Sequence, residues 1–444
     1  MKYYIYGKGV NGKSVSTFLE IYYPHCVYSF IDDSKEESSL ENLQKQIKQE
    51  DKILVVSTLY YDKMIHNLNQ YHLKNYENGI LWCGEVINNK IKYIKKPHKK
   101  YIGFVIEQFT QKHFGNLAQQ LKDLGYEIIY FVDNFKMYEK YSKIGSCFLA
   151  SNAILSQINT VDMMLLTNIT ATHKEVISID LTHGFQGATC YPFLEYTKAE
   201  RDFMKYVFST TDYIVCGSKK NHQDYEVFLS NIQENSRLLD VGYIKLDTDV
   251  EVYNDLVKSK CGAESQNNIV IFAFTFFNDI KRIVALMEQC ISMDLRVFFK
   301  PHSSYNKAIV DEIRIALSRE CRDYFVEDID YLEICYHSLC LISECSSMGY
   351  TYPLTSCKPS ICLDVGIRSD MEIMTKGCGE YYDERLMFMC QNDKDLSSIL
   401  REIKQMGTAH YASVLDYQKT ECFNFGNATR SLIEKIQTIL GDKK

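Results

Sequence analysis

A histidine follows each of two predicted strands, at positions where a side chain can project into a ligand site. His183 comes directly after the strand predicted for residues 176–181, and Gly184 then opens a turn. Because the pKa of imidazole lies near neutrality, a histidine in this place can act as a general base. The alternative is a histidine that only hydrogen-bonds the backbone of its own loop.

The second histidine belongs to a cluster that also carries a cation and two hydroxyls. Lys300 ends the strand predicted for residues 295–300, and His302, Ser303 and Ser304 follow it after a proline. A cation, an imidazole and hydroxyls together can bind the oxygens of a phosphate. A polar turn after proline is the alternative interpretation.

A third cluster contains Glu344, Ser346 and Ser347, directly after the strand predicted for residues 339–343. Hydroxyls and exposed amides at the start of a helix suit a diphosphate. A serine pair in this position is also a common helix cap. The cluster therefore indicates a ligand site only in combination with the two histidine-containing clusters.

The N-terminus carries a glycine-rich loop between a strand and a helix. Gly7, Gly9 and Gly12 follow the strand at residues 3–6, and Asp32 ends the next strand, twenty residues after Gly12. This is the phosphate-loop spacing of a Rossmann unit, in which glycines permit the turn and the acid holds a ribose hydroxyl. The alternative is that the glycines serve only the turn.

Alternating strands and helices must position these clusters, and this alternation predicts an α/β protein with parallel sheets covered on both faces. The expected strands are 3–6, 27–31, 52–57, 101–106, 127–132, 162–166, 176–181, 213–216, 241–247, 269–275, 295–300, 339–343 and 360–363. The expected helices are 14–21, 116–124, 198–207, 282–293, 307–318, 394–405 and 429–440, the last packing back across a domain boundary.

The alternation restarts twice, which predicts three domains. Residues 1–88 form a small Rossmann-like module, residues 101–257 a second α/β domain and residues 269–444 a third. Polar stretches at 88–100 and 258–268 read as linkers. The first contains six lysines, at 90, 92, 95, 96, 99 and 100. Such a run is either solvated or attracts anionic lipid headgroups or an anionic polymer.

Composition narrows the class of function. The 444 residues carry a net charge of −7, which argues against nucleic-acid binding through a basic surface. The longest apolar run, 269–277, is far shorter than the ~20 residues that span a bilayer. No signal peptide is recognisable at the start, so the protein is expected in the cytoplasm, with peripheral contact at the inner membrane face through the lysine-rich stretch as an option.

No metal site is expected from the sequence. The 16 cysteines are scattered and form no CxxC pair, so they read as free thiols that behave as small hydrophobes. The Asp-x-Asp spacing at 328–330 follows a polar, helix-like stretch and not a strand. We therefore predict neither a structural zinc nor a metal essential for catalysis.

The order of motifs resembles that of the CDP-glycerol glycerophosphotransferases of the teichoic-acid and capsule polymerase group. The chain shows His-Gly after a strand, then Gly-Tyr-x-basic-x-Asp at 242–247, basic-Pro-His at 300–302, and Ser-acid-x-Ser-Ser at 343–347 followed by Lys358-Pro359. The resemblance covers residues 101–440. Glu344 and Cys345 stand where the family usually has Asp and Tyr.

The resemblance implies a GT-B fold, a pair of Rossmann-like domains, here behind the small N-terminal module. It implies transfer of glycerol phosphate from CDP-glycerol to an acceptor hydroxyl, with release of CMP and with no essential cofactor. His183 would deprotonate the acceptor and His302 would stabilise the leaving CMP. Lys300, Ser346, Ser347, Glu344 and Gly184 would surround the donor, and a polysaccharide or glycolipid would be the acceptor.

Other functions fit the same residues. A GT-B glycosyltransferase that uses a CMP- or UDP-sugar would keep the serines on the phosphates. A nucleotide-sugar epimerase also uses two such domains. A catalytically silent scaffold would use only the N-terminal loop, as a nucleotide sensor. Release of free nucleotide together with an acceptor product separates transfer from epimerisation, and nucleotide binding to the N-terminal loop without turnover favours the scaffold.

Overall fold

The computed structural model describes residues 1–57, 60–107, 111–168, 170–182, 184–185, 197–260, 267–274, 277, 279–302, 308–326, 330–344, 346–364 and 382–441. Their strands form three sheets whose strand pairs run parallel, which confirms the predicted α/β class. The chain divides into two compact units. One contains residues 1–181, 202–214 and 234–237, and the other contains residues 182–201, 215–233 and 238–444.

The N-terminal sheet has the order β2-β1-β3-β4. Its strands are β1 (Lys2–Tyr6), β2 (Val27–Ile31), β3 (Lys52–Val55) and β4 (Tyr76–Asn78). The helices between them are α1 (Val10–Tyr22), α2 (Leu40–Leu43) and α3 (Tyr61–Gln70). The short β4 strand carries polar residues and lacks an apolar run, which explains why the sequence did not reveal it.

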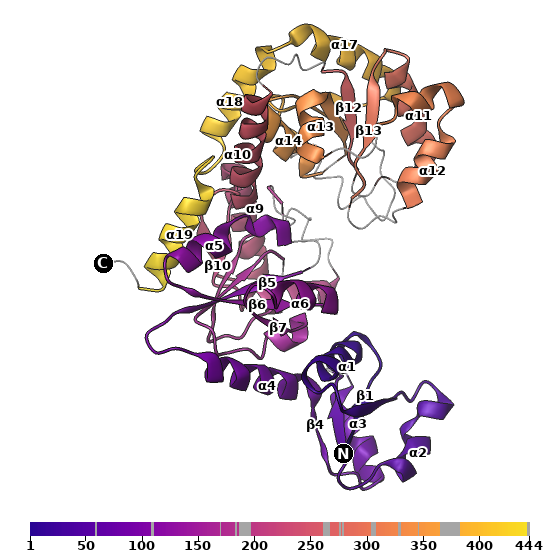
Figure 1. The fold of residues 1–444 in the computed structure, drawn as a ribbon, viewed down its shortest axis with the longest axis vertical. Coiled ribbons are helices and arrows are strands. Elements are labelled where there is room, and N and C mark those ends of the chain that lie inside the picture. Colours follow the sequence, from indigo (N-terminus) through magenta and orange to yellow (C-terminus); the bar gives the residue numbers. More distant parts are fainter. Residues whose placement is uncertain are drawn as a thin grey trace. The chain divides into compact units, whose positions relative to one another are not determined.

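The stretch predicted as a linker at residues 88–100 is helical over its first half. Helix α4 (Gly79–Ile94) continues through it (Figure 1). Asn88 is buried in this helix, donates to the Gln157 carbonyl oxygen at 2.8 Å and accepts from Thr160 Oγ1 at 2.8 Å. Gly84 lets α4 approach closely, since a Cβ there would lie 2.4 Å from Gln157 Cβ. The helix therefore joins the N-terminal module to the sheet that follows.

Most lysines of this stretch are engaged within the fold. Lys96 pairs with Glu127 at 2.8 Å and Lys100 with Asp162 at 3.4 Å. Lys90 and Lys95 lie over the rings of tyrosines, at 5.3 and 5.2 Å from the ring centroids. These lysines are therefore engaged in contacts within the protein. Their attraction to an anionic membrane surface stays a prediction.

The central sheet has the order β11-β10-β9-β8-β5-β6-β7. Its strands are β5 (Tyr101–Ile106), β6 (Glu127–Val132), β7 (Ser146–Leu149), β8 (Met163–Leu166), β9 (Ile177–Asp180), β10 (Tyr213–Val215) and β11 (Arg237–Leu239). The helices are α5 (Leu117–Asp123), α6 (Phe135–Tyr141), α7 (Asn152–Leu155), α8 (Lys198–Phe208) and α9 (Lys219–Ile232). Strands β5 and β8 are buried along their whole length, as expected for the middle of a parallel sheet.

The strand predicted at residues 241–247 is wrong. β11 ends at Leu239, and helix α10 (Ile244–Ser259) begins three residues after Val241. Gly242 makes the turn between them with φ +99°, and a Cβ there would lie 2.2 Å from the Phe423 carbonyl oxygen. The apolar residues at 241, 244 and 246 are buried by a turn and a helix, a pattern that short runs do not separate from a strand.

The third sheet has the order β13-β12-β14-β15-β16. Its strands are β12 (Ile269–Phe272), β13 (Arg296–Phe299), β14 (Ser338–Ser343), β15 (Ser360–Leu363) and β16 (Met387–Cys390). The helices are α11 (Ile280–Ile291), α12 (Ala308–Ala316), α13 (Tyr331–His337), α14 (Met348–Ser356), α17 (Leu396–Met406), α18 (Ala409–Thr420) and α19 (Ala428–Ile439).

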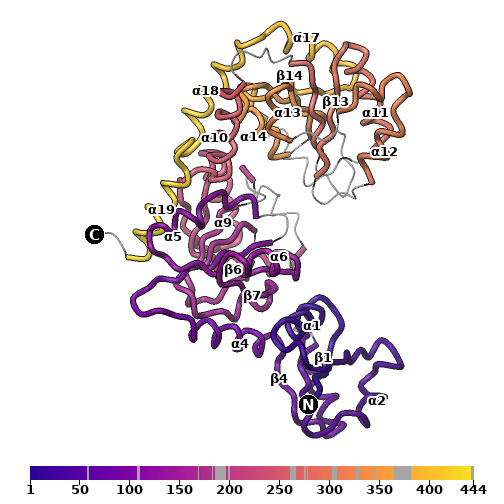
Figure 2. The backbone as a smooth tube through the Cα atoms, viewed as in Figure 1, coloured from indigo at the N-terminus to yellow at the C-terminus, as the bar shows by residue number. Residues whose placement is uncertain are grey.

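Helices cover both faces of this sheet. Val270 and Phe272 pack with α11, α12 and α17, whereas Ile269 and Ile271 pack with α10 and α13 on the other face. This alternation is the two-residue period of a strand buried on both sides. Helix α11 packs beside α12, and α19 packs beside α10 (Figures 1 and 2).

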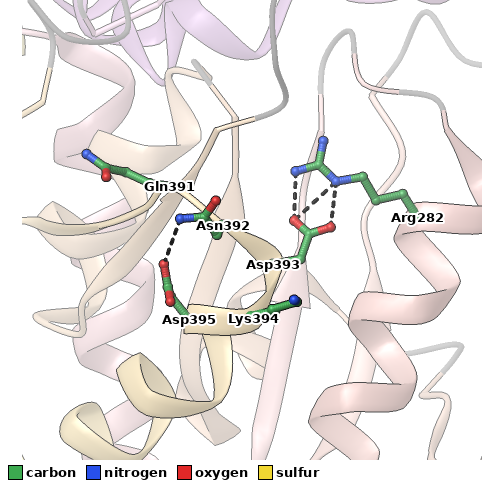
Figure 3. Close-up of a pocket in the computed structure, with 6 residues that line it drawn as sticks. All are labelled: Arg282, Gln391, Asn392, Asp393, Lys394 and Asp395. Carbon is green, nitrogen blue, oxygen red and sulfur yellow. Dashed lines mark hydrogen bonds and ion pairs between the residues drawn. The ribbon is translucent and has the colours of Figure 1, made fainter.

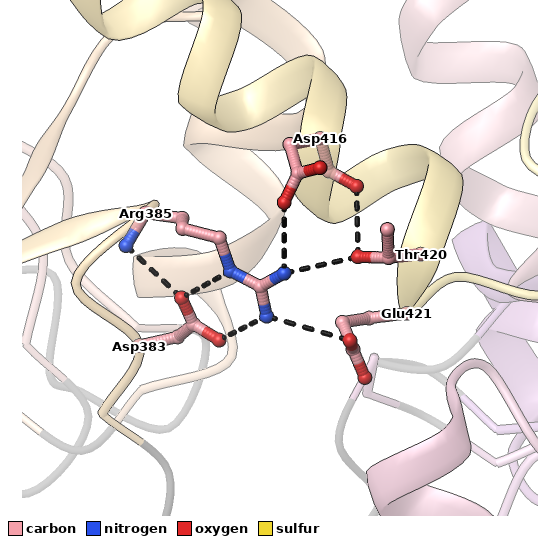
Figure 4. A network of polar contacts seen from close by, with 5 residues as sticks. All are labelled: Asp383, Arg385, Asp416, Thr420 and Glu421. Carbon is pink, nitrogen blue, oxygen red and sulfur yellow. Dashed lines mark hydrogen bonds and ion pairs between the residues drawn. The ribbon is translucent and has the colours of Figure 1, made fainter.

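An arginine fixes α18 to the chain that enters β16 (Figure 4). Arg385 forms ion pairs with Asp383 at 2.7 Å and with Asp416 of α18 at 3.1 Å. It also donates to Thr420 Oγ1 at 2.9 Å and lies 3.5 Å from Glu421. The carboxylates raise the pKa of Arg385, so the guanidinium stays charged at any ordinary pH. The network is a structural clamp.

Candidate functional site

The carboxyl edge of the third sheet gathers two of the three clusters. β13, β12 and β14 are neighbouring parallel strands, so the residues that follow them lie at the same edge. Lys300 follows β13 and Glu344 follows β14. Parallel α/β sheets bind their ligands outside this edge, which makes it the candidate site.

Lys300 is a desolvated cation at this edge. Its Nζ lies 4.6 Å from the ring centroid of Tyr331 in α13. Burial, and then the neighbouring ammonium of Lys245, lower the pKa of Lys300, while the carboxylates of Asp249 and Asp330 act in the opposite direction. Among the described residues no carboxylate lies within ion-pair distance of Lys300. A cation held out of water without a paired anion is suited to receive a phosphate.

Lys245, which sequence reasoning did not assign, adds a second cation. It belongs to the first turn of α10 and forms an ion pair with Asp249 one turn later. Its place as the basic residue of the Gly-Tyr-x-basic-x-Asp motif was the signal that could have identified it. Tyr331 had no such signal, because only the fold brings its ring under Lys300.

His302 is exposed, two residues beyond Lys300. The backbone is tied to the sheet just before it, since the Lys300 N–H donates to the Phe272 carbonyl oxygen at 2.8 Å. Ser303 and Ser304 lie outside the described residues. His302 is therefore accessible to a ligand at the sheet edge.

Glu344 occupies a different environment from the two serines after it. It is only 2% exposed and accepts a hydrogen bond from the Phe277 backbone N–H at 3.4 Å. Its charge helps to raise the pKa of the Cys362 thiol, after burial itself. This carboxylate ties the chain after β12 to the end of β14, so it shapes the edge from inside the protein.

Ser346 and Ser347 begin helix α14. Ser346 Oγ accepts from the Met348 N–H at 3.3 Å, and the Ser346 carbonyl oxygen accepts from Gly349 at 2.9 Å. Ser347 is exposed and is the N-cap residue, but its side chain makes no capping hydrogen bond. Ser346 thus serves the helix turn, whereas the Ser347 hydroxyl does not cap the helix.

The segment after β9 packs against the start of α14. A Cβ built on Gly184 would lie 3.5 Å from Ser347 Cβ and 3.8 Å from Ser347 Oγ. Phe185 is 1% exposed, and its ring stacks on Tyr350 of α14 at 6.0 Å and meets Tyr243 edge-on at 6.3 Å. The structure therefore brings the first and third clusters into contact.

A strained residue precedes His183. Thr182 has φ +58°, the left-handed region that a β-branched residue rarely adopts. Its Oγ1 donates to the Gly184 carbonyl oxygen at 3.4 Å, across the turn. Strain of this kind concentrates at ligand sites. His183 itself lies outside the described residues, as do Gln186 and Gly187.

Two charged residues of the family motifs hold the fold together. Asp247 Oδ2 accepts from the Thr429 N–H at 2.7 Å and from its hydroxyl at 3.0 Å, at the N-terminus of α19. Lys358 Nζ donates to the carbonyl oxygens of Tyr336 and Ser338, both at 2.7 Å, at the end of α13. Neither residue is placed to act on a ligand.

The N-terminal loop is shaped mainly by its own turn. Gly7 has φ +111°, and a Cβ on Gly12 would lie 2.0 Å from the Gly7 carbonyl oxygen. Gly9 precedes α1, and a Cβ there meets nothing within 4 Å. The Ser34 hydroxyl donates to Asp32 at 2.5 Å, and this hydrogen bond, the Ser34 N–H and neighbouring lysines hold the pKa of Asp32 below its usual range, against the opposing effect of burial. Only Gly9 offers an open approach to a ligand.

An open pocket of about 480 Å³ lies at the far end of the same sheet edge, where β15 and β16 end (Figure 3). Arg282 of α11 donates three hydrogen bonds to the Asp393 carboxylate, at 2.7, 2.9 and 3.2 Å. Its charge is therefore neutralised, and Asp395 adds a second carboxylate to the lining. This pocket is a poorer place for a diphosphate than Lys300.

No protein-family model and no curated protein sequence matches the chain. Solved structures share its fold. The wall teichoic acid polymerase TagF with CDPG is 16% identical with a TM-score of 0.57, and the match covers 87% of this chain and 98% of TagF. S. aureus MnaA with UDP is 13% identical with a TM-score of 0.53, covering 78% and 98%. A UDP-N-acetylglucosamine 2-epimerase is 11% identical with a TM-score of 0.50, covering 78% and 97%.

These likenesses show the fold. The chain has the GT-B architecture of a polymerase and of nucleotide-sugar enzymes, as its motif order predicted, with a smaller parallel sheet in front. Over the described residues, no helix is long and apolar enough to span a bilayer.

Proposed function

We propose that this protein is a GT-B transferase that moves glycerol phosphate from CDP-glycerol to an acceptor hydroxyl in the synthesis of a surface polysaccharide or a teichoic-acid-like polymer. The observation that carries the proposal is the environment of Lys300. It is a desolvated cation with no carboxylate at ion-pair distance among the described residues, and it lies at the sheet edge that also presents His302 and Ser347. A donor diphosphate supplies a counter-charge to this lysine.

The residues divide the work of an in-line transfer. The acceptor oxygen attacks the phosphorus that bears glycerol while His183 takes the hydroxyl proton. The bond from this phosphorus to the bridging oxygen breaks, and CMP leaves with the electron pair. His302 and Lys300 stabilise the charge that develops on CMP, and Ser347 holds the donor phosphates. No step needs a metal or a cofactor.

The remaining residues position this machinery. Gly184 places the turn after β9 beside Ser347, and the Phe185 ring packs against Tyr350 and Tyr243. Glu344 and Ser346 shape the loop before α14 from within. In this proposal residues 101–257 form the acceptor side and 269–444 the donor side, and the N-terminal module offers Gly9 to a further nucleotide. A polysaccharide or glycolipid is the acceptor.

A second donor class is supported by the fold. MnaA with UDP and the UDP-N-acetylglucosamine 2-epimerase share the architecture almost as well as TagF does. A glycosyltransferase that uses a UDP- or CMP-sugar would place its diphosphate on the same cation and serine. The released nucleotide distinguishes the two functions.

The test is nucleotide release by the purified full-length protein. It is incubated with CDP-glycerol or with UDP-, CMP- and GDP-sugars, in the presence of polysaccharide or glycolipid extract, and the products are separated by chromatography. CMP released from CDP-glycerol together with a labelled acceptor is the expected result. UDP or CMP released from a sugar donor would replace the phosphotransferase with the glycosyltransferase.

Two variants test the assigned histidines. His183→Gln and His302→Gln should each abolish turnover while the thermal unfolding curve stays unchanged. His66→Gln is the matched control, because His66 is an exposed histidine of the N-terminal module whose ring contacts Gln70 of the same helix. Turnover retained in both test variants would contradict the assigned roles.

A further inference from the structure

Three metal-ligand side chains, none of them assigned a role above, converge at the end of the central sheet. Cys216 follows β10, His222 lies in the first turns of α9, and Asp240 follows β11. One ligand atom from each, the thiol sulfur, a ring nitrogen and a carboxylate oxygen, lies within 4.8 Å of the other two. We propose that these three side chains bind a zinc ion.

The backbones that carry the ligands are fixed in place. The Cys216 N–H donates to the Leu239 carbonyl oxygen at 2.9 Å, and the Gly242 N–H donates to the Cys216 carbonyl oxygen at 2.9 Å. The Asp240 carbonyl oxygen accepts from Asn424 Nδ2 at 2.8 Å. Binding a metal therefore requires side-chain adjustment only, which is the preorganisation that a metal site needs.

The imidazole is oriented as in known metal sites. His222 Nδ1 faces the cluster and lies 2.6 Å from Asp240 Oδ1, whereas Nε2 lies 3.3 Å from Glu226 Oε1, one turn along α9. A ligating histidine usually donates its second ring N–H to a carboxylate, which fixes the tautomer and makes the ligating nitrogen more basic. Glu226 is this carboxylate.

The donor set selects the metal. A thiolate and an imidazole favour zinc over calcium or magnesium, which prefer oxygen ligands. Exposure rises across the site, because Cys216 is buried while the side chains of His222 and Asp240 are 27% and 48% exposed. The ion can enter from the Asp240 side, and water completes the tetrahedron. The metal displaces the proton of the thiol, whose pKa is raised by burial.

The site is placed to stabilise the turn after β9. Gly217, next to Cys216, lies so close to that turn that a Cβ there would be 2.8 Å from the Phe185 carbonyl oxygen. Zinc at Cys216 would hold the chain on which Phe185 rests. The role is structural, so it leaves the metal-free transfer proposed above unchanged and stands independently of it.

The test is zinc binding by full-length protein freed of metal with a chelator. ZnCl2 alone is titrated against a chromophoric competitor, and CoCl2 is added in a parallel experiment. We expect one ion per chain, a rise in Tm with zinc, and a cobalt spectrum with thiolate charge transfer and the strong d–d bands of a tetrahedral site. Cys216→Ala or His222→Gln should weaken binding by roughly 100-fold or more, and Glu226→Gln by roughly 10-fold.

Cys321→Ser is the matched control, since Cys321 is a half-buried thiol in the same unit that belongs to no such cluster in the described part of the chain. It should bind zinc like the unaltered protein. If Cys216→Ala does not fold, His222→Gln decides, because this side chain lies on an accessible helix face. Absence of stoichiometric binding, or binding unaffected by His222→Gln, would overturn the proposal and leave a plain His222–Asp240 ion pair.

Discussion

Replacement of Lys300 by methionine should lower the affinity for the donor without lowering the stability of the fold. Methionine keeps the length of the aliphatic stem and its packing on Tyr331 but removes the charge. The proposed function makes this charge a contact to the donor diphosphate. In the absence of donor, the same charge is desolvated and lies near Lys245, so its burial costs stability.

The expected magnitude follows from the contact that is lost. A hydrogen bond to a charged group contributes about 1.5–3 kcal/mol. At about 1.36 kcal/mol per factor of ten, the affinity for donor should fall roughly 10- to 160-fold. Stability should move the other way, because the variant no longer buries an unpaired ammonium among the described groups. Lys300→Met should therefore unfold at the same Tm or a higher one.

The assay is isothermal titration of CDP-glycerol, or of CMP, into the protein, with thermal unfolding measured on the same samples. The control is Lys281→Met, which removes an exposed lysine of α11 in the same domain and should change neither quantity. Because burial lowers the pKa of Lys300, donor affinity of the unaltered protein should decline with rising pH before exposed lysines titrate. Unchanged donor affinity in Lys300→Met would refute the assignment, and a fall in Tm would refute the argument from desolvation.

Three further outcomes are expected from the packing. Phe185→Ala should cost about 3–5 kcal/mol in urea unfolding, because a 1%-exposed ring leaves a cavity, and Phe185→Leu should cost less. Asp247→Ala should cost about 0.5–2 kcal/mol and speed proteolysis of α19, whose first N–H groups it caps; unaltered proteolysis would contradict this role. Burial lowers the pKa of His410 below 6.5, so the unfolded chain binds the proton first and stability should fall as pH drops below about 6.5. His410→Leu should remove that part of the slope in pH-dependent unfolding; an identical slope would contradict it.

Periodicity predicted the long elements and missed the short polar ones. Buried strands such as β5 and β12 appear as unbroken apolar runs bounded by polar residues, which is a local signal. β4 has no apolar run, so nothing local distinguishes it from a loop. The many lysines of residues 88–100 favour a linker over a helix. The apolar residues at 87 and 91, which α4 buries, are too few to reverse that prediction.

The candidate site was predictable to the extent that it follows strands. Lys300 and Glu344 were singled out because they succeed apolar runs, and the parallel sheet places both at one edge. The sequence could not distinguish their environments, which only packing creates. Lys300 is a desolvated cation over the ring of Tyr331, whereas Glu344 is 2% exposed and accepts a hydrogen bond from the Phe277 N–H.

The sequence by itself determined the class of fold, since alternation of apolar runs with amphipathic stretches allows little besides a parallel α/β sheet. It also placed the reactive residue types at strand ends. Only the tertiary structure decided which of them meet. Gly184 lies beside Ser347, and Cys216 lies with His222 and Asp240, because strands and helices distant in sequence pack together. Such contacts depend on how side chains pack over the whole chain, and the spacing of residues within a short segment does not predict that packing.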